Sequence, residues 1–156
     1  MEIVGLSSIH PIPFWLGKIA GTVSLLFLVV RAFGMDWSSV VLPALRPWAL
    51  ALSLLSVTIL ILSFLRLADS VRMGLPREST TLITTGIYAY SRNPMYIGVY
   101  LLLIASCLYT PNPINLLCAL VSIWVHHRIV LAEEKFLADR FGTAWEDYKK
   151  RVRRYL

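Results

Sequence analysis

Residues 84–98 read TTGIYAYSRNPMYIG and lead from a polar segment into a long apolar run. Arg92, Asn93 and the tyrosines at 88, 90 and 96 crowd polar groups against the start of a hydrophobic helix. Polar and ionisable side chains in such a position are costly to a membrane protein and usually serve a function. We therefore expect a binding or catalytic site at this stretch.

The composition places the chain among membrane proteins rather than soluble ones. Its 156 residues suit one domain. Of these residues 57% are hydrophobic and 15% are charged, with a mean hydropathy of +0.67, whereas a soluble domain carries about 25% charged residues. The net charge of +6 comes from basic residues clustered at the ends of apolar segments. This clustering favours anionic lipid over nucleic acid as the partner.

Four apolar runs predict an all-α polytopic membrane protein with about four transmembrane helices. The runs are Phe14 to Val30, Trp48 to Leu65, Met95 to Tyr109 and Ile114 to Val130. Pro111-Asn112-Pro113 separates the last two, and because a helix cannot continue through this sequence we predict a helical hairpin. An arm of about 15 residues rises only ~22 Å against a bilayer core of ~30 Å. The arms must therefore borrow flanking residues, thin the bilayer or stop short of spanning it.

The first helix is expected to start near Pro13, because proline is tolerated in the first turn. Within it, the spacing Gly17-x-x-x-Gly21 permits close packing against another helix.

The positive charges predict an orientation in the membrane. Of the 15 Lys and Arg residues, eight lie from Arg128 onward and four lie between Arg66 and Arg92. The positive-inside rule then places both termini in the cytoplasm. We expect a multi-pass protein of a prokaryotic cytoplasmic membrane.

The C-terminal segment has the pattern of a helix that lies on a membrane surface. Gly142 is predicted to end one helix, and Thr143-x-x-Glu146 is a capping box that begins another. Apolar side chains then recur at three- and four-residue spacing, and basic residues fill most other positions. An aromatic stripe beside a basic face is typical of a helix on anionic lipid. The stripe consists of Trp145, Tyr148, Val152 and Tyr155.

Glu133-Glu134 follows the fourth apolar run, and taken alone such a pair most often forms ion pairs at the headgroup level. On a helix the two side chains point about 100° apart, so one pocket easily receives only one of them. His126-His127 has no third ligand of suitable type beside it, and Cys107 and Cys118 lie inside apolar runs. We therefore expect no metal site.

Taken together and in order, these motifs resemble the isoprenylcysteine carboxyl methyltransferase and phospholipid N-methyltransferase superfamily of integral membrane enzymes. The resemblance covers about residues 80–156 and rests on the ordered set rather than on any one motif. The set comprises residues 84–98, the Pro-broken hairpin, Glu133-Glu134 and Phe141-Gly142-x-x-Trp145-x-x-Tyr148-x-x-x-Val152-Arg153-Arg154. It implies S-adenosylmethionine as cofactor and a lipophilic methyl acceptor that enters from the bilayer.

The resemblance also implies site residues. The family's Arg-His-Pro-x-Tyr motif corresponds to Arg92-Asn93-Pro94-Met95-Tyr96, and its cofactor-binding glutamate corresponds to Glu133 with Glu134 beside it. The implied catalytic residues are Arg92, Asn93, Tyr96 and Arg128, and the implied cofactor-binding residues are Thr80, Thr81, Leu82, Ile83, Tyr88, Asn93, Pro94, Met95, Tyr96, Glu133 and Glu134.

These residue types suit the chemistry of the cofactor. One of the two glutamates would pair with its ammonium through a charge-assisted hydrogen bond. Arg92 and Asn93 are candidates to receive its carboxylate, and the ring of Tyr88 or Tyr96 to stabilise its sulfonium. Methyl transfer is a single displacement, so positioning supplies much of the rate.

Two positions depart from the eukaryotic carboxyl methyltransferases of this superfamily. Asn93 stands where they have His, and Ile129 stands where they have an Arg that meets the substrate carboxylate; Arg128 lies about 100° away on the helix. Both departures disfavour a prenyl-cysteine carboxylate and leave a lipid amine, an isoprenoid acid or another apolar acceptor open. The alternative functions are a membrane NADPH-dependent sterol or enone reductase and a non-catalytic protein with the same scaffold.

We expect a single membrane domain over residues 1–156. Residues 1–66 would hold two N-terminal transmembrane helices and residues 67–156 the cofactor-binding half. The sequence leaves open the oligomeric state and whether the first two helices pack on the second half or face a partner.

Overall fold

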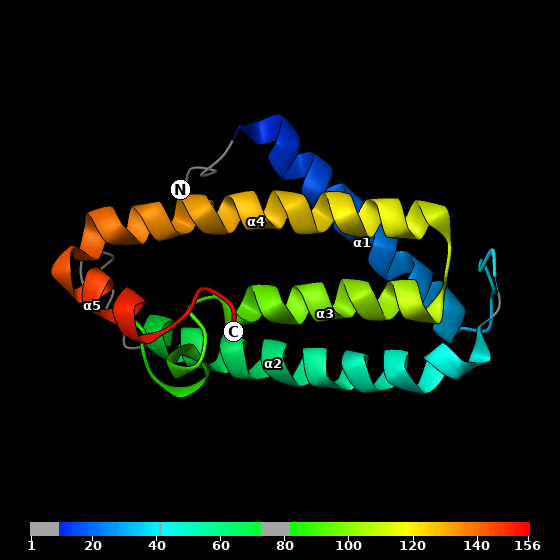
Figure 1. Ribbon diagram of the computed structural model, residues 1–156, viewed down its shortest axis with the longest axis horizontal. Coiled ribbons are helices and arrows are strands. Elements are labelled where there is room, and N and C mark those ends of the chain that lie inside the picture. Colours follow the sequence, from blue (N-terminus) through cyan, green and yellow to red (C-terminus); the bar gives the residue numbers. More distant parts are fainter. Residues whose placement is uncertain (1–9, 41, 73–81) are drawn as a thin grey trace.

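The computed structural model describes residues 10–40, 42–72 and 82–156. Within these ranges the fold is all-α. The long helices α2, α3 and α4 run side by side, α1 crosses them obliquely, and α5 folds back from the end of α4 (Figure 1). The α-helices are α1 (Pro11–Ala32), α2 (Arg46–Arg72), α3 (Pro94–Tyr109), α4 (Pro113–Phe141) and α5 (Thr143–Arg151), and the 3-10 helices are η1 (Pro43–Leu45) and η2 (Gly86–Ala89).

The helix lengths and compositions are those of a polytopic membrane protein. In the described part of the chain, three segments are long and apolar enough to cross a bilayer: Pro11–Ala32, Pro43–Leu67 and Pro113–Phe141. The helix α3 has 16 residues and rises only about 24 Å. The predicted all-α membrane fold is confirmed, with α3 as a shorter fourth apolar helix.

The predicted hairpin is also present, with Thr110, Pro111 and Asn112 between α3 and α4. Of the possibilities expected for short arms, α4 borrows flanking residues and reaches 29 residues, whereas α3 stays short. The difference arises because α4 continues through Glu133-Glu134 to Phe141. This extension carries the acidic pair on a regular helix beyond the last apolar run.

The first helix begins at Pro11, two residues earlier than Pro13, the predicted start. The His10 side chain accepts a hydrogen bond from the backbone N–H of Ile12 at 3.4 Å. Pro11 and Pro13 fit in the first turn because their missing N–H groups would have no partner within the helix there.

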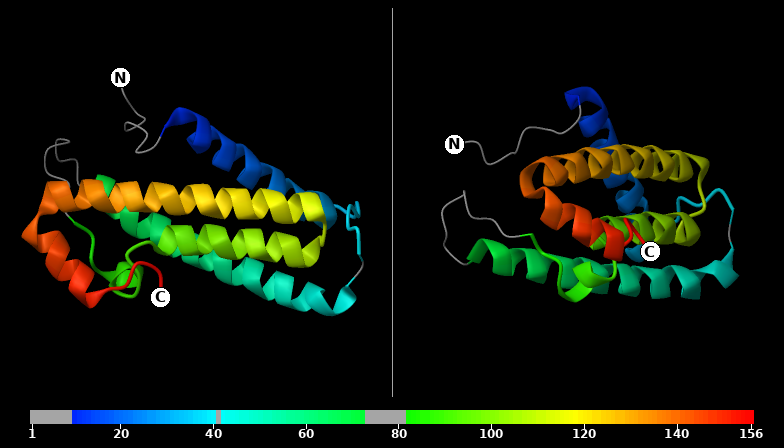
Figure 2. Two further views of the ribbon diagram at one scale, coloured as in Figure 1. Left: turned by 45° about the horizontal axis from the view of Figure 1, so that its top comes forward. Right: turned by 60° about the vertical axis from the view of Figure 1, so that its left-hand side comes forward.

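The first two helices pack on the second half of the chain, which settles a question that the sequence left open. The main partner of α1 is α4, and the main partner of α2 is α3. Both views in Figure 2 show α1 lying across α4. The predicted close approach at Gly17-x-x-x-Gly21 is confirmed: a Cβ at Gly17 would collide with Val125, and one at Gly21 would lie 2.6 Å from Oγ of Ser122.

A network of neutral polar side chains fixes how α1, α3 and α4 meet inside the bundle. Ser24 donates to Oδ1 of Asn115 at 2.7 Å, and Ser106 donates to the carbonyl of Ser24 at 2.6 Å. Nδ2 of Asn115 also donates to the carbonyl of Thr110 at 3.1 Å. These residues are fully buried. Hydrogen bonds between membrane helices are worth about 0.6 kcal/mol on average, so the network specifies register more than it adds stability.

Candidate functional site

The chain enters the candidate site through the 3-10 turn η2. Its first residue, Gly86, has φ +64°, and a Cβ there would lie 2.6 Å from Nε of Arg66. Only glycine meets both conditions without strain. The turn is held by Tyr148, whose hydroxyl donates to the carbonyl of Tyr88 at 2.7 Å. Burial raises the pKa of Tyr88, and the negative charge of Glu133 adds to the effect, which places these two side chains within electrostatic reach.

Glu134 is the centre of a buried ionic cluster. Nε and Nη2 of Arg92 donate to its Oε1 at 3.1 and 3.0 Å, and Nδ2 of Asn93 donates to the same oxygen at 3.0 Å. Nε of Arg154 donates to the other oxygen, Oε2, at 2.9 Å. The side chains of Arg92 and Glu134 are only 6% and 9% exposed. Both carboxylate oxygens of Glu134 are thus engaged by the protein itself.

The same residues fasten the C-terminal tail, residues 152–155, to the start of α3. Nη1 of Arg92 donates to the carbonyl of Val152 at 2.7 Å, and its backbone N–H donates to the carbonyl of Arg153 at 3.0 Å. The carbonyl of Arg154 accepts from Ser91 Oγ at 3.1 Å and from Asn93 Nδ2 at 3.2 Å. We call Ser91, Arg92, Asn93, Glu134 and Arg154 the tail clasp.

The prediction that the C-terminal stripe faces a membrane surface is wrong for Trp145, Tyr148 and Val152. Trp145 and Tyr148 are each 2% exposed, and with Val152 they form a buried apolar cluster. The stripe therefore packs on the protein rather than on a membrane surface. Leu82, Leu137, Ala138 and Phe141 pack against this cluster.

The predicted capping box is wrong as well. Thr143 is the first residue of α5 rather than its N-cap, and Gly142 takes the cap position without a side-chain hydrogen bond. The basic residues Lys149, Lys150 and Arg151 are exposed on the surface of the protein. Contact between these residues and anionic lipid stays a prediction.

Glu133 has a different environment from its neighbour. The Tyr96 hydroxyl donates to its Oε1 at 2.9 Å. Among the described residues no cation forms an ion pair with Glu133, although Lys18 of α1 lies within electrostatic reach. Glu133 therefore keeps a carboxylate oxygen available at the polar end of the bundle.

Three further polar side chains lie nearer to the hairpin end of α3 and α4 or in the tail. Nδ1 of His127 is 2.7 Å from the Tyr155 hydroxyl, which lies 3.4 Å from the hydroxyl of Tyr100. The sequence assigned Tyr155 to the membrane-facing stripe, gave His127 no role and did not single out Tyr100. The only signal was the four-residue spacing of Tyr96 and Tyr100, which puts both on one face of α3.

The remaining predicted site residues are less closely joined to these groups. Pro94 is the buried first residue of α3. Met95 beside it is half-buried, as are Leu82 and Ile83 ahead of η2. Arg128 is exposed, and within the described ranges no hydrogen bond or ion pair links it to the tail clasp or to Glu133. The structure therefore gives no support to a catalytic role for Arg128. Thr80 and Thr81 lie outside the described residues.

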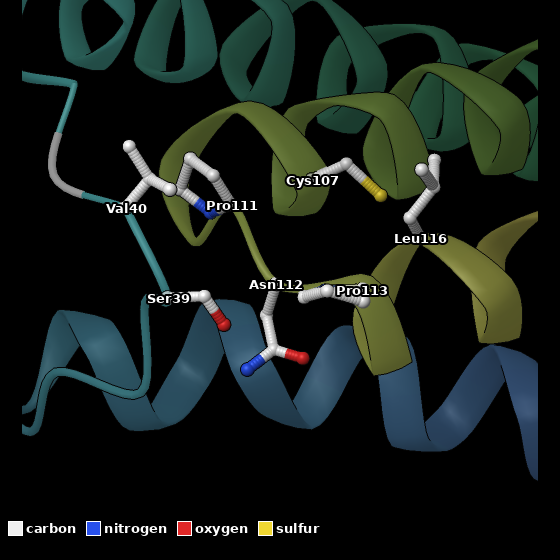
Figure 3. A pocket seen from close by; sticks show the side chains of 7 residues that line it. All are labelled: Ser39, Val40, Cys107, Pro111, Asn112, Pro113 and Leu116. Carbon is white, nitrogen blue, oxygen red and sulfur yellow. The ribbon is translucent and has the colours of Figure 1, made fainter.

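A pocket of about 340 Å³ lies at the other end of α3 and α4, beside the hairpin turn (Figure 3). Its polar lining groups are largely engaged: the N–H of Ser39 donates to the carbonyl of Pro111 at 2.9 Å, and Asn112 donates to the carbonyl of Trp37 at 2.8 Å. Because the pocket is a helix length from Glu133, it is separate from the candidate site. Its lining residues are Ser39, Val40, Cys107, Pro111, Asn112, Pro113 and Leu116.

Curated relatives match a little under half of the chain. The protein-S-isoprenylcysteine O-methyltransferase of Mus musculus is 36% identical over 76 residues, which cover 48% of this chain and 27% of the relative. The protein of the same name from Schizosaccharomyces pombe is 32% identical over 72 residues, covering 46% of this chain and 30% of the relative. The chain thus matches less than a third of the length of either methyltransferase.

An uncharacterized protein of Haemophilus influenzae is 35% identical over 63 residues, which are 40% of this chain and the whole of that relative. No solved structure matches the chain. The family model for phospholipid methyltransferases matches residues 45–144. Because that match covers well over half of the chain, this membrane protein belongs to the phospholipid methyltransferase family, as the ordered motifs predicted.

Proposed function

We propose that the chain is a membrane-embedded, S-adenosylmethionine-dependent methyltransferase that acts on a lipophilic acceptor. The observation that carries the proposal is the half-buried carboxylate of Glu133, which Tyr96 binds at 2.9 Å and which has no ion-pair partner in the described part of the chain. A carboxylate in this state suits a ligand's ammonium group, because a charge-assisted bond is stronger than a neutral one.

The residues around Glu133 fit part of the cofactor directly. Tyr96 bonds to Glu133, and Tyr88 lies within reach of its charge, so an aromatic face is at hand for a sulfonium. Arg92 and Asn93 fit less well as ligands of the cofactor's carboxylate, because the tail clasp occupies their donors. We propose that they position the site by holding the tail, which leaves the backbone at Leu82 and Ile83 as the remaining implied contact.

When bound, S-adenosylmethionine supplies the methyl group and is left as a neutral thioether. The chain's own residues then have to bind, orient and exclude water. Glu133 and Tyr96 anchor the polar end, and the tail clasp holds residues 152–155 on the neighbouring Glu134 face of α4. Positioning of this kind accounts for much of the rate in a one-step displacement.

The acceptor is proposed to enter from the bilayer between the helices, while the cofactor enters from the aqueous side. The matched relatives are named for methylation of an isoprenylcysteine, and the family for phospholipids. Both names describe a lipid-linked acceptor. In this proposal residues 67–156 form the cofactor-binding half, and both termini lie in the cytoplasm.

The test is calorimetric binding of S-adenosylmethionine and S-adenosylhomocysteine to detergent-purified protein, with NADPH measured alongside. We expect both adenosyl compounds to bind and NADPH not to bind. Binding of NADPH alone would favour the reductase alternative. Binding of none of the three, by protein with a cooperative unfolding transition, would favour a non-catalytic scaffold.

A further inference from the structure

Tyr100, Tyr155 and His127 form a connected row of hydrogen-bonding side chains, which we call the Tyr–His chain. The Tyr155 hydroxyl lies 3.4 Å from the Tyr100 hydroxyl and 2.7 Å from Nδ1 of His127. All three side chains are half-buried. The row joins three parts of the fold, since Tyr100 is on α3, His127 is on α4 and Tyr155 is in the tail.

The position of the Tyr–His chain points to a function rather than to packing alone. His127 lies within the apolar run 114–130 of a candidate membrane span, where ionisable side chains are costly and usually functional. Tyr100 follows Tyr96 by four residues, so both lie on one face of α3 and about 6 Å apart along its axis. On α3 the Tyr–His chain therefore begins one helical turn from Tyr96. On α4, His127 lies six residues before Glu133, about 9 Å along the axis, and shares a helix face with Glu134, seven residues further on.

We propose that the Tyr–His chain is a proton relay for the methyl acceptor, so that the acceptor nucleophile is one that carries a proton, an amine or a hydroxyl, rather than a carboxylate. This inference rests on the function proposed above and specifies its acceptor. A carboxylate is already deprotonated at neutral pH and would need no such relay. A protonated amine or a hydroxyl has to lose a proton before its electron pair can attack.

The proton and electron accounting is complete within the proposed reaction. The acceptor's N–H or O–H proton passes to the Tyr155 oxygen, either directly or through Tyr100, and the Tyr155 proton passes to Nδ1 of His127. The electron pair left on the acceptor forms the new bond to the methyl carbon. The bond from that carbon to sulfur breaks, and sulfur keeps its electron pair.

The first test needs no catalysis. In protein with nitrogen-15-labelled histidine, the ring nitrogen signals of His127, assigned by comparison with His127→Gln, report the hydrogen bond from Tyr155. Tyr155→Phe should shift them, and Tyr109→Phe, a tyrosine change at the hairpin end of α3, should not. Unshifted signals in Tyr155→Phe would overturn the relay.

The second test uses methyl-tritiated S-adenosylmethionine and the total lipid extract of the expression host. We expect label that survives strong base, as N-methyl amines and methyl ethers do. Product identification by mass then separates amines from hydroxyls. Label released as volatile methanol would identify a methyl ester and overturn the proposal.

The variants complete the second test. His127→Gln and Tyr155→Phe should slow transfer about 10²-fold, the lower end of the effect of a general base, while S-adenosylhomocysteine affinity stays unchanged. Added imidazole should restore part of the rate to His127→Ala, which a purely structural loss would not allow. Undiminished transfer in both His127→Gln and Tyr155→Phe would overturn the relay. Failure of the wild type to bind S-adenosylhomocysteine would instead overturn the proposed function, and this inference with it.

Discussion

The two neighbouring glutamates on α4 differ in how many side chains bind their carboxylates. Glu134 accepts from two arginines and an asparagine, so both of its oxygens are occupied. Glu133 accepts from one phenol. Because successive helix residues point about 100° apart, two identical side chains enter separate environments. The comparison indicates that the fully paired carboxylate holds the structure and the sparsely paired one is available to a ligand.

The two faces of α4 that carry Glu134 and Glu133 also differ in what packs beside them. The face of Glu134 receives the tail, which Arg92 and Asn93 bind through backbone carbonyls. The face of Glu133 lies toward α1, where Lys18 is within electrostatic reach. The face of Glu134 is closed by residues of the chain, and the face of Glu133 leaves a carboxylate oxygen available at the polar end of the bundle. Substitutions on each face can therefore separate folding from binding.

The largest expected effect is on the closed face. Glu134→Ala should lower the free energy of unfolding by about 3–5 kcal/mol, because Arg92 would stay buried without its carboxylate. Denaturant unfolding of the detergent-solubilised protein, followed by tryptophan fluorescence, measures the change. Glu146→Ala is the matched control, since its ion pair with Lys149 is exposed and worth about 0–1 kcal/mol. Equal losses in the two variants would remove the distinction between the faces.

The open face should respond in binding instead of stability. Glu133→Gln should weaken S-adenosylhomocysteine binding by about 1.5–3 kcal/mol, the worth of a hydrogen bond to a charged group. Unfolding should change little, because the amide oxygen can still accept from Tyr96. Calorimetry measures the affinity, and Asp139→Asn, an exposed acidic residue further along α4, serves as the control. Normal affinity in Glu133→Gln would show that the ammonium is bound elsewhere.

A third variant tests the packing of α1 against α4, the helix that carries both glutamates. Gly17→Ala should destabilise the protein by about 1–3 kcal/mol, because the added methyl group collides with Val125. The double variant Gly17→Ala/Val125→Ala should recover stability relative to Val125→Ala alone, and this coupling is measured in a double-mutant cycle. If Gly17→Ala is neutral or stabilising, as alanine is in an open helix position, then α1 does not pack as closely as described.

The sequence predicted the helices and the family better than it predicted the contacts of the tail. Hydropathy and the Pro-Asn-Pro turn were enough for the four apolar helices, because both signals are local. The ordered motifs were enough for the family. The prediction for the C-terminal stripe failed because an apolar stripe has the same sequence pattern whether it faces lipid or protein. In the structure Trp145 and Tyr148 pack against Leu82 and against Leu137, Ala138 and Phe141 of α4. Arg92 also bonds to the carbonyls of Val152 and Arg153, a contact across some 60 residues of chain that the sequence pattern does not show.

The roles of the individual site residues could not be predicted from the sequence either, and the reason is physical. Arg92 beside a pair of glutamates is compatible with a ligand site or with an ion pair, and only distances separate these possibilities. The structure brings Arg92 to Glu134 and leaves Glu133 to Tyr96. Tyr155 and His127, 28 residues apart, could be joined only once the tail was seen to fold back on α4.

The smallest expected effect concerns the hydrogen bond from the Tyr148 hydroxyl of α5 to the carbonyl of Tyr88. Tyr148→Phe should lower stability by about 1 kcal/mol at pH 7, since it removes one hydrogen bond to a carbonyl. Burial raises the pKa of Tyr148 to about 12, above about 10 for an unfolded tyrosine. The advantage of the wild type is therefore complete below pH 10 and declines as the pH rises toward 12, because the unfolded tyrosine ionises first.

Unfolding measured at pH 7 and 11 should show the difference in stability between wild type and Tyr148→Phe narrowing. Tyr90→Phe, a change at an 80% exposed tyrosine, should show no such gap at either pH. A gap that stays constant would mean that the Tyr148 hydroxyl is solvated and does not hold the turn at Tyr88.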